Sequence, residues 1–224
     1  MMDKNPFNRE TLTKDVLHEW QNLLNETAEI LSVPAGLITR LDGSEIEILL
    51  SSATEGNPYP AAIAAPFPDS GWYCEHTLKS RGLNLIPNAL LDPAWQDNFA
   101  VEMNMIAYVG MPIDRPDGRQ FGTVCFLDNK QNEHNILHIR LVKQIKRMIE
   151  LSLRIVQAKG EIDRRDRLLD DLSRIYPICS YCKKVREDSG KWVSVEKYVS
   201  DISGAQPSHG VCPQCYKREM NRLG

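Results

Sequence analysis

Four of the six cysteines in this 224-residue chain lie near its C-terminal end, in two pairs with the spacing Cys-x-x-Cys. The pairs are Cys179 with Cys182 and Cys212 with Cys215, and His209 stands three residues before the second pair. A two-residue gap lets both sulfurs of a pair reach one soft metal ion, and four thiolates at about 2.3 Å form a tetrahedral zinc site. The spacing therefore predicts a structural zinc ion with no open position for a substrate.

Alternatives to four-thiolate zinc remain open for this region. His209 could replace one cysteine as a ligand, or it could orient a thiolate from outside the ligand shell. The pairs could also be redox-active, or could form a disulfide with each other. The sequence shows no apolar stretch typical of a secretory signal, and reduced thiols persist in the cytoplasm. We therefore expect a cytoplasmic protein in which residues 177–220 form a small zinc-binding module.

The other two cysteines, Cys74 and Cys125, lie in the first half of the chain. Cys74 follows Trp72 and Tyr73 and precedes His76 by two residues, a setting that allows a bilin-attaching thiol or a redox sensor. Cys125 falls within an apolar strand pattern and is expected in the core. Simple packing is the alternative for both, because free cysteines are commonly buried.

Composition and charge limit the class of protein. The chain is 42% hydrophobic and 25% charged, as expected of a globular protein. No apolar run approaches the roughly 20 residues that a membrane helix needs. Residues 1–138 carry 9 Lys and Arg against 19 Asp and Glu, a net charge of −10, whereas residues 139–224 carry 18 against 11, a net charge of +7. The basic half keeps a nucleic-acid partner open as an alternative.

Periodic apolar residues predict an α+β domain in the first part of the chain. Residues 11–32 show helical spacing, and a short helix is expected to end at Gly82. The predicted strands are residues 37–41, 45–50, 83–86, 107–113 and 121–127. The first two strands are joined by Asp42-Gly43 and the last two by a turn containing Pro116-Asp117-Gly118, which predicts two antiparallel hairpins.

A long helix is predicted from about residue 136 to residue 176, where no proline intervenes. A series spaced alternately by three and four residues runs through Leu141, Gln144, Met148, Leu151, Ile155, Ala158, Ile162, Arg165, Leu169, Leu172 and Tyr176. This spacing is typical of a coiled-coil seam and predicts a homodimer. The alternative is one helix packed on its own domain, followed by a second helix.

Several short segments together resemble the GAF domain of bacterial signalling proteins. They are Gly71-Trp-Tyr-Cys-Glu-His-Thr-Leu78, Leu85-Ile-Pro-Asn-Ala-Leu-Leu-Asp-Pro-Ala-Trp95, Tyr108-Val-Gly-Met-Pro-Ile113, Pro116-Asp-Gly118 and Gly122-Thr-Val-Cys-Phe-Leu-Asp128. The resemblance implies an antiparallel sheet with terminal helices on one face and a small-molecule pocket on the other. On resemblance and position, the expected ligand-binding residues are Trp72, Tyr73, Cys74, His76, Trp95 and Asp128.

The tail resembles a short C-terminal module found after PAS, GAF or receiver domains in bacterial sensor proteins. Its matching residues are Pro177-Ile-Cys-Ser-Tyr-Cys-Lys-Lys184, Trp192, Tyr198 and Ser208-His-Gly-Val-Cys-Pro-Gln-Cys215. We accordingly predict a GAF sensor domain over residues 12–140, a signalling coiled coil over 141–176 and a four-cysteine module over 177–220.

Only about fifty residues follow the long helix, too few for a kinase or nucleotide-binding output domain. The chain is therefore expected to be a dimeric sensor that binds an unknown small ligand and signals through a coiled coil to the tail and a protein partner. A nucleic-acid-binding regulator that uses the basic half is an alternative, and a GAF-type redox enzyme acting through Cys74 is another. No set of catalytic residues beyond these cysteines is evident, so an enzyme is not expected.

Overall fold

The computed structural model describes residues 12–173 and 177–223, with the side chains of 170–173 and 223 left out. The chain divides into two compact units, residues 1–159 and 160–224, and each is described by itself. The three predicted segments do not coincide with these two units, and their boundaries stay predictions. Among the described helices, none combines the length and the apolar composition needed to cross a membrane.

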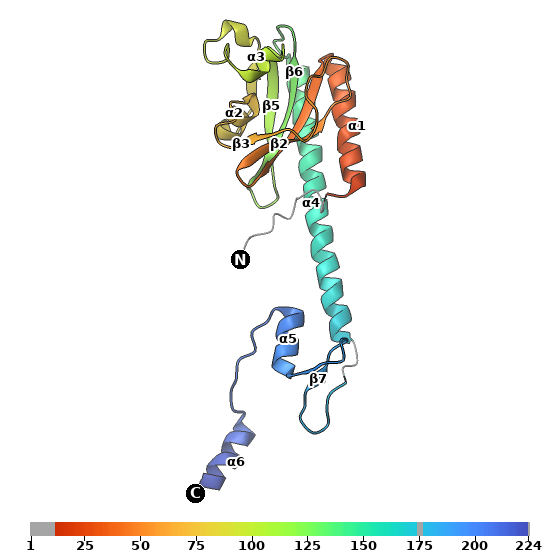
Figure 1. The fold of residues 1–224 in the computed structure, drawn as a ribbon, viewed down its shortest axis with the longest axis vertical. Coiled ribbons are helices and arrows are strands. Elements are labelled where there is room, and N and C mark those ends of the chain that lie inside the picture. The colour runs from red at the N-terminus through yellow and green to blue at the C-terminus, as the bar shows by residue number, and fades with distance from the viewer. Residues whose placement is uncertain (1–11, 174–176, 224) are drawn as a thin grey trace. The chain divides into compact units, whose positions relative to one another are not determined.

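The first unit is built on one six-stranded antiparallel sheet with the order β3-β2-β1-β6-β5-β4 (Figure 1). The strands are β1 Ala35–Asp42, β2 Glu45–Ser51, β3 Ala64–Pro66, β4 Asn84–Ile86, β5 Ala107–Asp114 and β6 Gln120–Asp128. Both predicted hairpins are confirmed, as β1–β2 and β5–β6. The pairing of β1 with β6 joins the two hairpins into one sheet.

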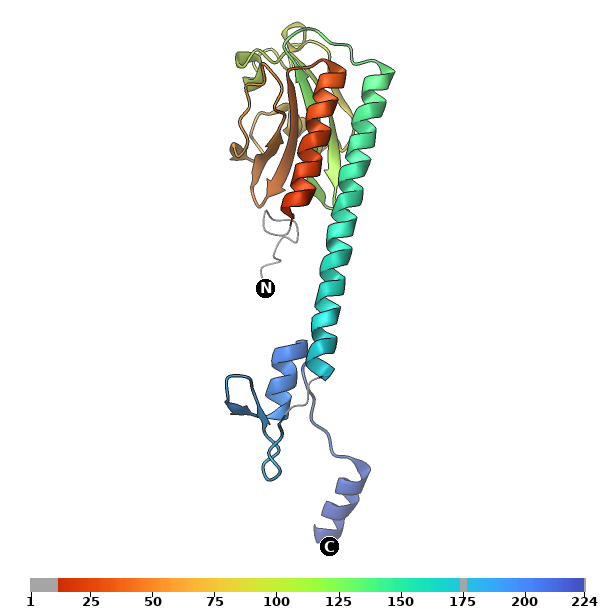
Figure 2. The ribbon, with the colours of Figure 1, turned by 90° about the vertical axis from the view of Figure 1, so that its right-hand side faces the viewer.

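Two helices cover one face of the sheet. Helix α1 spans Lys14–Leu31 and begins after Thr13, whose side chain accepts a hydrogen bond from the Val16 backbone N–H. Helix α4 spans Ile136–Ser173 and runs beside α1 over this face (Figure 2). Trp20 of α1 packs edge-on against Phe121 of β6 in the core between them, with ring centroids 5.9 Å apart.

Short elements and loops cover the opposite face. These are α2 Tyr73–Ser80, the 3₁₀ helix Ala89–Leu91, α3 Phe99–Glu102 and the loop between β2 and β3, and they enclose a second buried core. The sequence predicted Gly82 at the end of the short helix, but Arg81 is the residue that adopts the left-handed conformation there, with φ 54°. A residue with a side chain thus ends α2, at a small conformational cost.

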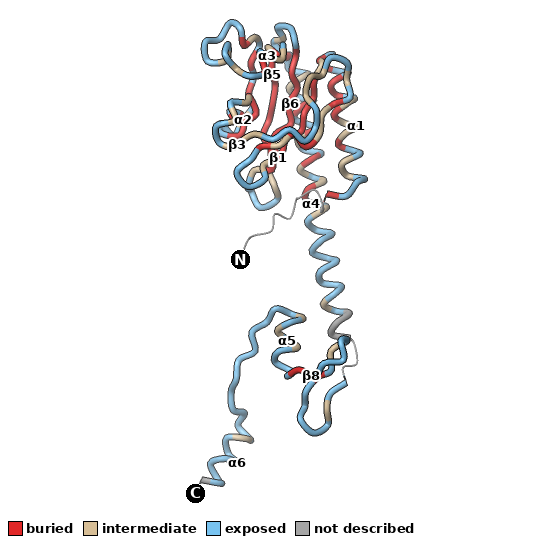
Figure 3. The backbone as a smooth tube through the Cα atoms, in the orientation of Figure 1, coloured by how far each residue is buried: buried red, intermediate tan, exposed pale blue. Residues whose placement is uncertain are grey.

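Helix α4 presents two different faces. Its apolar residues Val142, Ile145, Ile149 and Leu153 are buried in the first core. The predicted coiled-coil series contains none of these four residues. Its first member, Leu141, is half-buried and packs against the first core. Met148, Leu151, Ile155, Ile162 and Leu169 are exposed, as Figure 3 shows for the distal part of α4. The side chain of Leu172 and the whole of Tyr176 lie outside the described residues. The helix therefore packs on its own domain and also keeps a separate apolar seam.

The second unit contains small elements after the distal part of α4. Strands β7 Val185–Arg186 and β8 Trp192–Val193 form a hairpin in which Val185 and Val193 are buried. Helix α5 spans Val195–Ser203 and ends at Gly204, and α6 spans Pro213–Leu223. Ser194 caps α5 by accepting a hydrogen bond from the Lys197 backbone N–H.

Candidate functional site

An apolar cavity of about 110 Å³ lies in the second core of the first unit. Because side chains alternate along a strand, β1, β2, β5 and β6 send one set to the helical face and the other to this cavity. Its lining comes from the strands, from α2 and α3, and from the β2–β3 loop: Leu37, Ile48, Tyr59, Ile63, Trp72, Tyr73, Cys74, Asn98, Phe99, Ala100, Met103, Tyr108 and Leu127.

The hydroxyl of Tyr59 is a buried polar group in this wall without a hydrogen-bond partner among the described residues. Its oxygen is buried, and no hydrogen-bond partner for it occurs in the described part of the chain. The backbone of Tyr59 is fixed, because its N–H donates to Asn57 Oδ1 at 3.0 Å and its carbonyl accepts from Ser51 Oγ at 2.6 Å. Burial raises the pKa of Tyr59, so the hydroxyl keeps its proton and is available as a donor.

A hydrogen-bonded cluster forms another part of the wall. Tyr108 is fully buried; its hydroxyl lies 2.8 Å from Thr77 Oγ1 and donates to Cys74 Sγ at 3.7 Å. The ring of Tyr108 occupies space over Gly110, where a Cβ atom would overlap it. Glycine at that position therefore lets the tyrosine fold back over its own strand and reach α2.

The second sulfur of this region lies beside Cys74. Cys125 Sγ is 3.5 Å from Cys74 Sγ, and both residues are buried. Cys74 lines the cavity, whereas Cys125 lies behind it in β6. The two cysteines are 51 residues apart in the sequence, so no local sequence motif indicates that they are in contact.

The residues expected to bind a ligand are distributed over three places. Trp72, Tyr73 and Cys74 line the cavity. His76 and Trp95 line a separate, open cleft that also touches Trp72, and their rings meet edge-on with centroids 5.1 Å apart.

Asp128 lines neither the cavity nor the cleft. It is fully buried at the end of β6, where its carboxylate accepts hydrogen bonds from Asn132 Nδ2 at 2.8 Å and from the Lys130 backbone N–H at 3.4 Å. Asp128 is thus the last residue of β6 and holds the turn that leaves the sheet.

Sequence reasoning missed Tyr59 and the strand residues of the wall. Tyr108 and Leu127 could have been assigned to it from the alternation along their strands, since their neighbours Val109 and Phe126 belong to the opposite core. Tyr59 stands between two prolines in a loop, and nothing local to it indicates that its ring turns inward.

The structure corrects the prediction of a zinc site, because it does not bring the two Cys pairs together. Within residues 12–173 and 177–223, no group of three or more His, Cys, Asp or Glu side chains could hold a metal ion. Each pair closes only a local turn: the Lys183 N–H donates to the Cys179 carbonyl at 2.9 Å, and the Cys215 N–H donates to Cys212 Sγ at 3.4 Å. The Cys-x-x-Cys spacing determines these local turns, but a four-thiolate shell also needs the pairs to converge.

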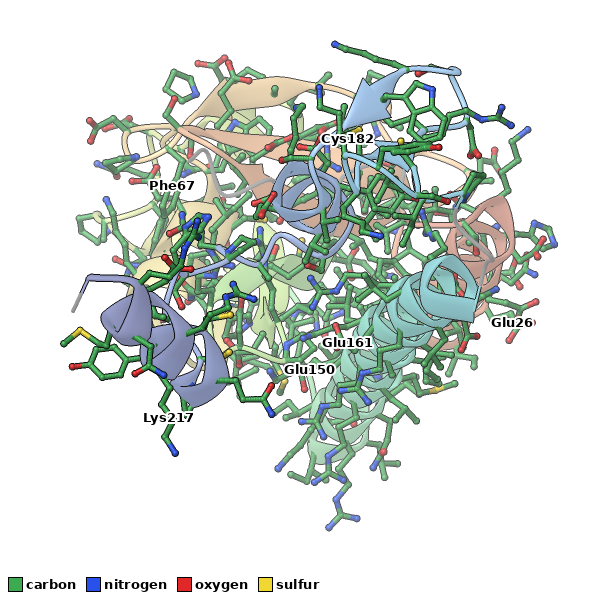
Figure 4. All side chains as sticks on the ribbon, turned by 90° about the horizontal axis from the view of Figure 1, so that it is seen from below. Glu26, Phe67, Glu150, Glu161, Cys182 and Lys217 are labelled. Carbon is green, nitrogen blue, oxygen red and sulfur yellow. The ribbon has the colours of Figure 1, made fainter. Side chains whose placement is uncertain are left out.

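His209 is exposed and belongs to no such group in the part of the chain that the structure describes. Cys182, labelled in Figure 4, and Cys212 are exposed, while Cys179 and Cys215 are half-buried. The expected structural zinc is therefore not supported, either with four thiolates or with His209 as a ligand.

Comparison with known proteins identifies the fold. No family model matches the chain, and no curated protein matches its sequence. Among solved structures, a bacteriophytochrome from R. palustris aligns with 88% of this chain and 44% of its own length, at a TM-score of 0.55 and 13% identity. The GAF domain of an Acinetobacter phosphoenolpyruvate-protein phosphotransferase aligns with 68% of this chain and 96% of its own length. Its TM-score is 0.51 and its sequence identity is 12%.

A methyl-accepting chemotaxis protein is also similar, with 64% of this chain and 90% of that one aligned, a TM-score of 0.52 and 14% identity. The first unit therefore has a GAF-like fold, as the sequence resemblance implied.

Proposed function

We propose that this chain is a regulatory protein that senses a small molecule in the cavity of its GAF-like unit. The observation that carries the proposal is a buried, unpaired hydroxyl, that of Tyr59, in a mostly apolar wall. Buried polar groups in proteins are nearly always hydrogen-bonded, so an unpaired donor on a residue that lines a cavity points to a partner supplied by a ligand. The proposed role is regulatory: the cavity binds the small molecule and does not convert it chemically.

The cavity favours a small, largely apolar ligand with one hydrogen-bond acceptor. Its volume of about 110 Å³ is comparable with engineered cavities of about 150 Å³ that hold benzene. The aromatic rings of Trp72, Tyr73 and Phe99 in the wall favour a planar ring in edge-on or offset contact. A tetrapyrrole is several times larger than such a ligand, so Cys74 is not proposed as an attachment point for a bilin.

Strand β5 offers a route from the cavity to α4. Tyr108 in β5 lines the cavity, and Asp114 ends the same strand. The backbone N–H of Asp114 donates to Glu150 Oε1 at 2.9 Å, and Lys146 pairs with both Asp114 and Glu150 (Glu150 is labelled in Figure 4). A shift of β5 on ligand binding would therefore act directly on the middle of α4. Signalling of this kind needs two helix arrangements that are close in free energy.

The exposed seam of α4 supports association with a second copy of the chain. Met148, Leu151 and Ile155 follow one another at heptad spacing, and Ile162 and Leu169 continue the series. Arg165 lies within the series between Ile162 and Leu169. A stripe of this length that is apolar at its other exposed positions, on an otherwise charged helix, is typical of a two-chain coiled coil. We propose that the sensor works as a homodimer through this seam.

The dimer is tested by sedimentation of the full chain. Ile155→Glu should convert a dimer into a monomer, because the carboxylate would be buried without a partner in the seam. Gln157→Glu adds the same charge at an exposed position that is not in the series and should leave the dimer intact. If the two variants have the same oligomeric state, the seam is not the dimer interface.

The output is proposed to pass to a protein partner through the second unit. Its described part exposes Tyr181, Trp192 and Tyr216, aromatic residues of the kind enriched at protein interfaces. Binding of nucleic acid is the second candidate, favoured by the net charge of +7 over residues 139–224. A steep loss of binding with added salt would identify the nucleic-acid alternative.

The sensing function is tested by extracting the protein as purified and analysing the extract by mass spectrometry. The expected result is a small ring compound, present in the wild type and depleted in Tyr59→Phe, which loses only the hydroxyl. An extract without any such compound, together with no thermal stabilisation by small phenols, would contradict the proposal.

A further inference from the structure

Cys74 and Cys125 are placed for chemistry with each other. Their sulfurs are 3.5 Å apart in the reduced protein, although α2 carries one and the central strand β6 carries the other. A disulfide has an S–S bond of about 2.05 Å, so the sulfurs need to approach by only about 1.5 Å. The pair is largely shielded from solvent, since Cys125 is fully buried and Cys74, which lines the cavity, is 5% exposed.

We propose that Cys74 and Cys125 form a reversible dithiol–disulfide site in the cavity wall, with a hydroperoxide as the oxidant. The proposal stands on the geometry of the two sulfurs and does not require the ligand of the proposed function. It goes beyond ligand sensing, because it assigns a covalent modification to two residues that no sequence motif links.

The geometry assigns different roles to the two thiols. Cys74 lines the cavity and therefore meets a hydroperoxide first, and Cys125 lies directly behind it. A hydrogen bond from the Cys125 thiol holds the pKa of Cys74 below its ordinary value, against the opposing effect of burial and with further help from the Thr123 and Tyr108 hydroxyls. Burial raises the pKa of Cys125. Cys74 is thus the more acidic thiol, and its thiolate is the nucleophile.

The reaction proceeds in two steps. The Cys74 thiolate attacks the outer oxygen of the hydroperoxide, the O–O bond breaks, and an alcohol or water leaves after taking up a proton. The sulfenic acid on Cys74 is then attacked by the Cys125 sulfur, which forms the S–S bond and expels hydroxide. That hydroxide takes the proton of the Cys125 thiol and leaves as water. Two thiols are oxidised, the hydroperoxide is reduced by two electrons, and a dithiol reductant reverses the change.

Formation of the disulfide would alter the cavity itself. Cys74 is a wall residue, and its sulfur also accepts a hydrogen bond from Tyr108, which lines the same cavity. Drawing Cys74 toward β6 therefore moves α2 relative to the sheet and breaks or lengthens that hydrogen bond. The redox state of the pair would then set the shape of the cavity.

The test is a disulfide map of the full-length protein. Fully reduced protein is treated with hydrogen peroxide, excess peroxide is removed with catalase, free thiols are alkylated in denaturant, and tryptic peptides are analysed without reduction. The peptide of residues 41–79 carries Cys74 and that of residues 120–130 carries Cys125. The expected result is a covalent link between these two peptides that disappears after treatment with dithiothreitol.

Two variants separate the roles. In Cys125→Ala, dimedone should capture a sulfenic acid on Cys74; in Cys74→Ala, Cys125 should remain a free thiol. Cys182→Ser, which changes an exposed cysteine of the tail, is the matched control and should leave the link unchanged. The proposal is overturned if wild-type Cys74 and Cys125 both remain thiols while Cys182 and Cys212 are oxidised. A link from Cys74 to a tail cysteine instead of Cys125 would overturn it equally.

Discussion

The two faces of the six-stranded sheet are covered by different kinds of structure. On one face, the long helices α1 and α4 bury continuous apolar stripes, and the core there includes Trp20, Phe121 and Ile149. On the other face, short helices and loops form the cover and leave a cavity of about 110 Å³. Long helices can match a sheet along their whole length, whereas short segments with different directions leave space between them. One face is thus closely packed by long helices, and the other contains the cavity.

The largest expected effect compares two phenylalanines, one on each face. Phe121→Ala removes a fully buried ring that packs against Trp20, and should lower the free energy of unfolding by about 3–5 kcal/mol. Phe99→Ala is the matched change in the cavity wall, where the side chain is 48% exposed, and should cost about 1 kcal/mol or less. Urea unfolding of both variants measures the difference, and equal losses would remove the distinction between the faces.

A smaller effect is expected at His134, which stands two residues before the start of α4. Both ring nitrogens are buried without a hydrogen-bond partner among the described residues, and burial lowers the pKa of His134 to about 4. The neighbouring His138 lowers this pKa further, while Asp128 and Glu133 oppose the shift.

The sign of the pH effect follows from this lowered pKa. Because the unfolded histidine has a pKa near 6.5, it binds a proton more readily than the folded one, so stability is fully present above about pH 6.5 and is lost as the pH falls toward 4. The loss attributable to His134 should be on the order of 2 kcal/mol. His134→Asn tolerates the positive φ of 45° and does not titrate, so its unfolding free energy should fall less between pH 6.5 and 4.5. If the unfolding free energy of the wild type and of His134→Asn falls equally over this pH range, this role of His134 is contradicted.

The smallest expected effect compares two tyrosines of the cavity wall. Tyr59→Phe removes an unpaired hydroxyl and should raise the stability of the ligand-free protein by about 1 kcal/mol. Tyr108→Phe removes a hydroxyl that lies 2.8 Å from Thr77 Oγ1 and should lower it by about 1 kcal/mol. Thermal unfolding of protein freed of small molecules measures both. A loss of stability in Tyr59→Phe would show that its hydroxyl has a partner in the protein.

Periodicity in the sequence was enough to predict most of the GAF-like unit. The helix predicted within residues 11–32 is present as α1 Lys14–Leu31, and both hairpins had the correct secondary structure, because the apolar residues repeat with the period of a helix or a strand. The cavity could not be predicted in the same way. Its wall brings together Tyr59, Cys74, Phe99 and Leu127, which come from a loop, two helices and a strand.

The cysteines show what local spacing in a sequence does and does not predict. Cys179 and Cys182, like Cys212 and Cys215, have a spacing typical of metal ligands, yet the prediction of zinc was wrong because spacing sets only the turn within each pair. Cys74 and Cys125 have no spacing that indicates contact, yet the fold places their sulfurs 3.5 Å apart. Contacts between distant segments depend on strand order and helix docking, which no local pattern determines.

Binding of two small probes, phenol and benzene, tests the central claim most directly. Both are about the size of the cavity, and only phenol carries an oxygen that can accept the hydrogen bond of Tyr59. In the wild type, phenol should bind about 5- to 10-fold more tightly than benzene, as one hydrogen bond of about 1 kcal/mol requires. In Tyr59→Phe this preference should vanish while benzene binding is kept. Failure of either probe to bind the wild type, or the same preference for phenol in both proteins, would contradict the account.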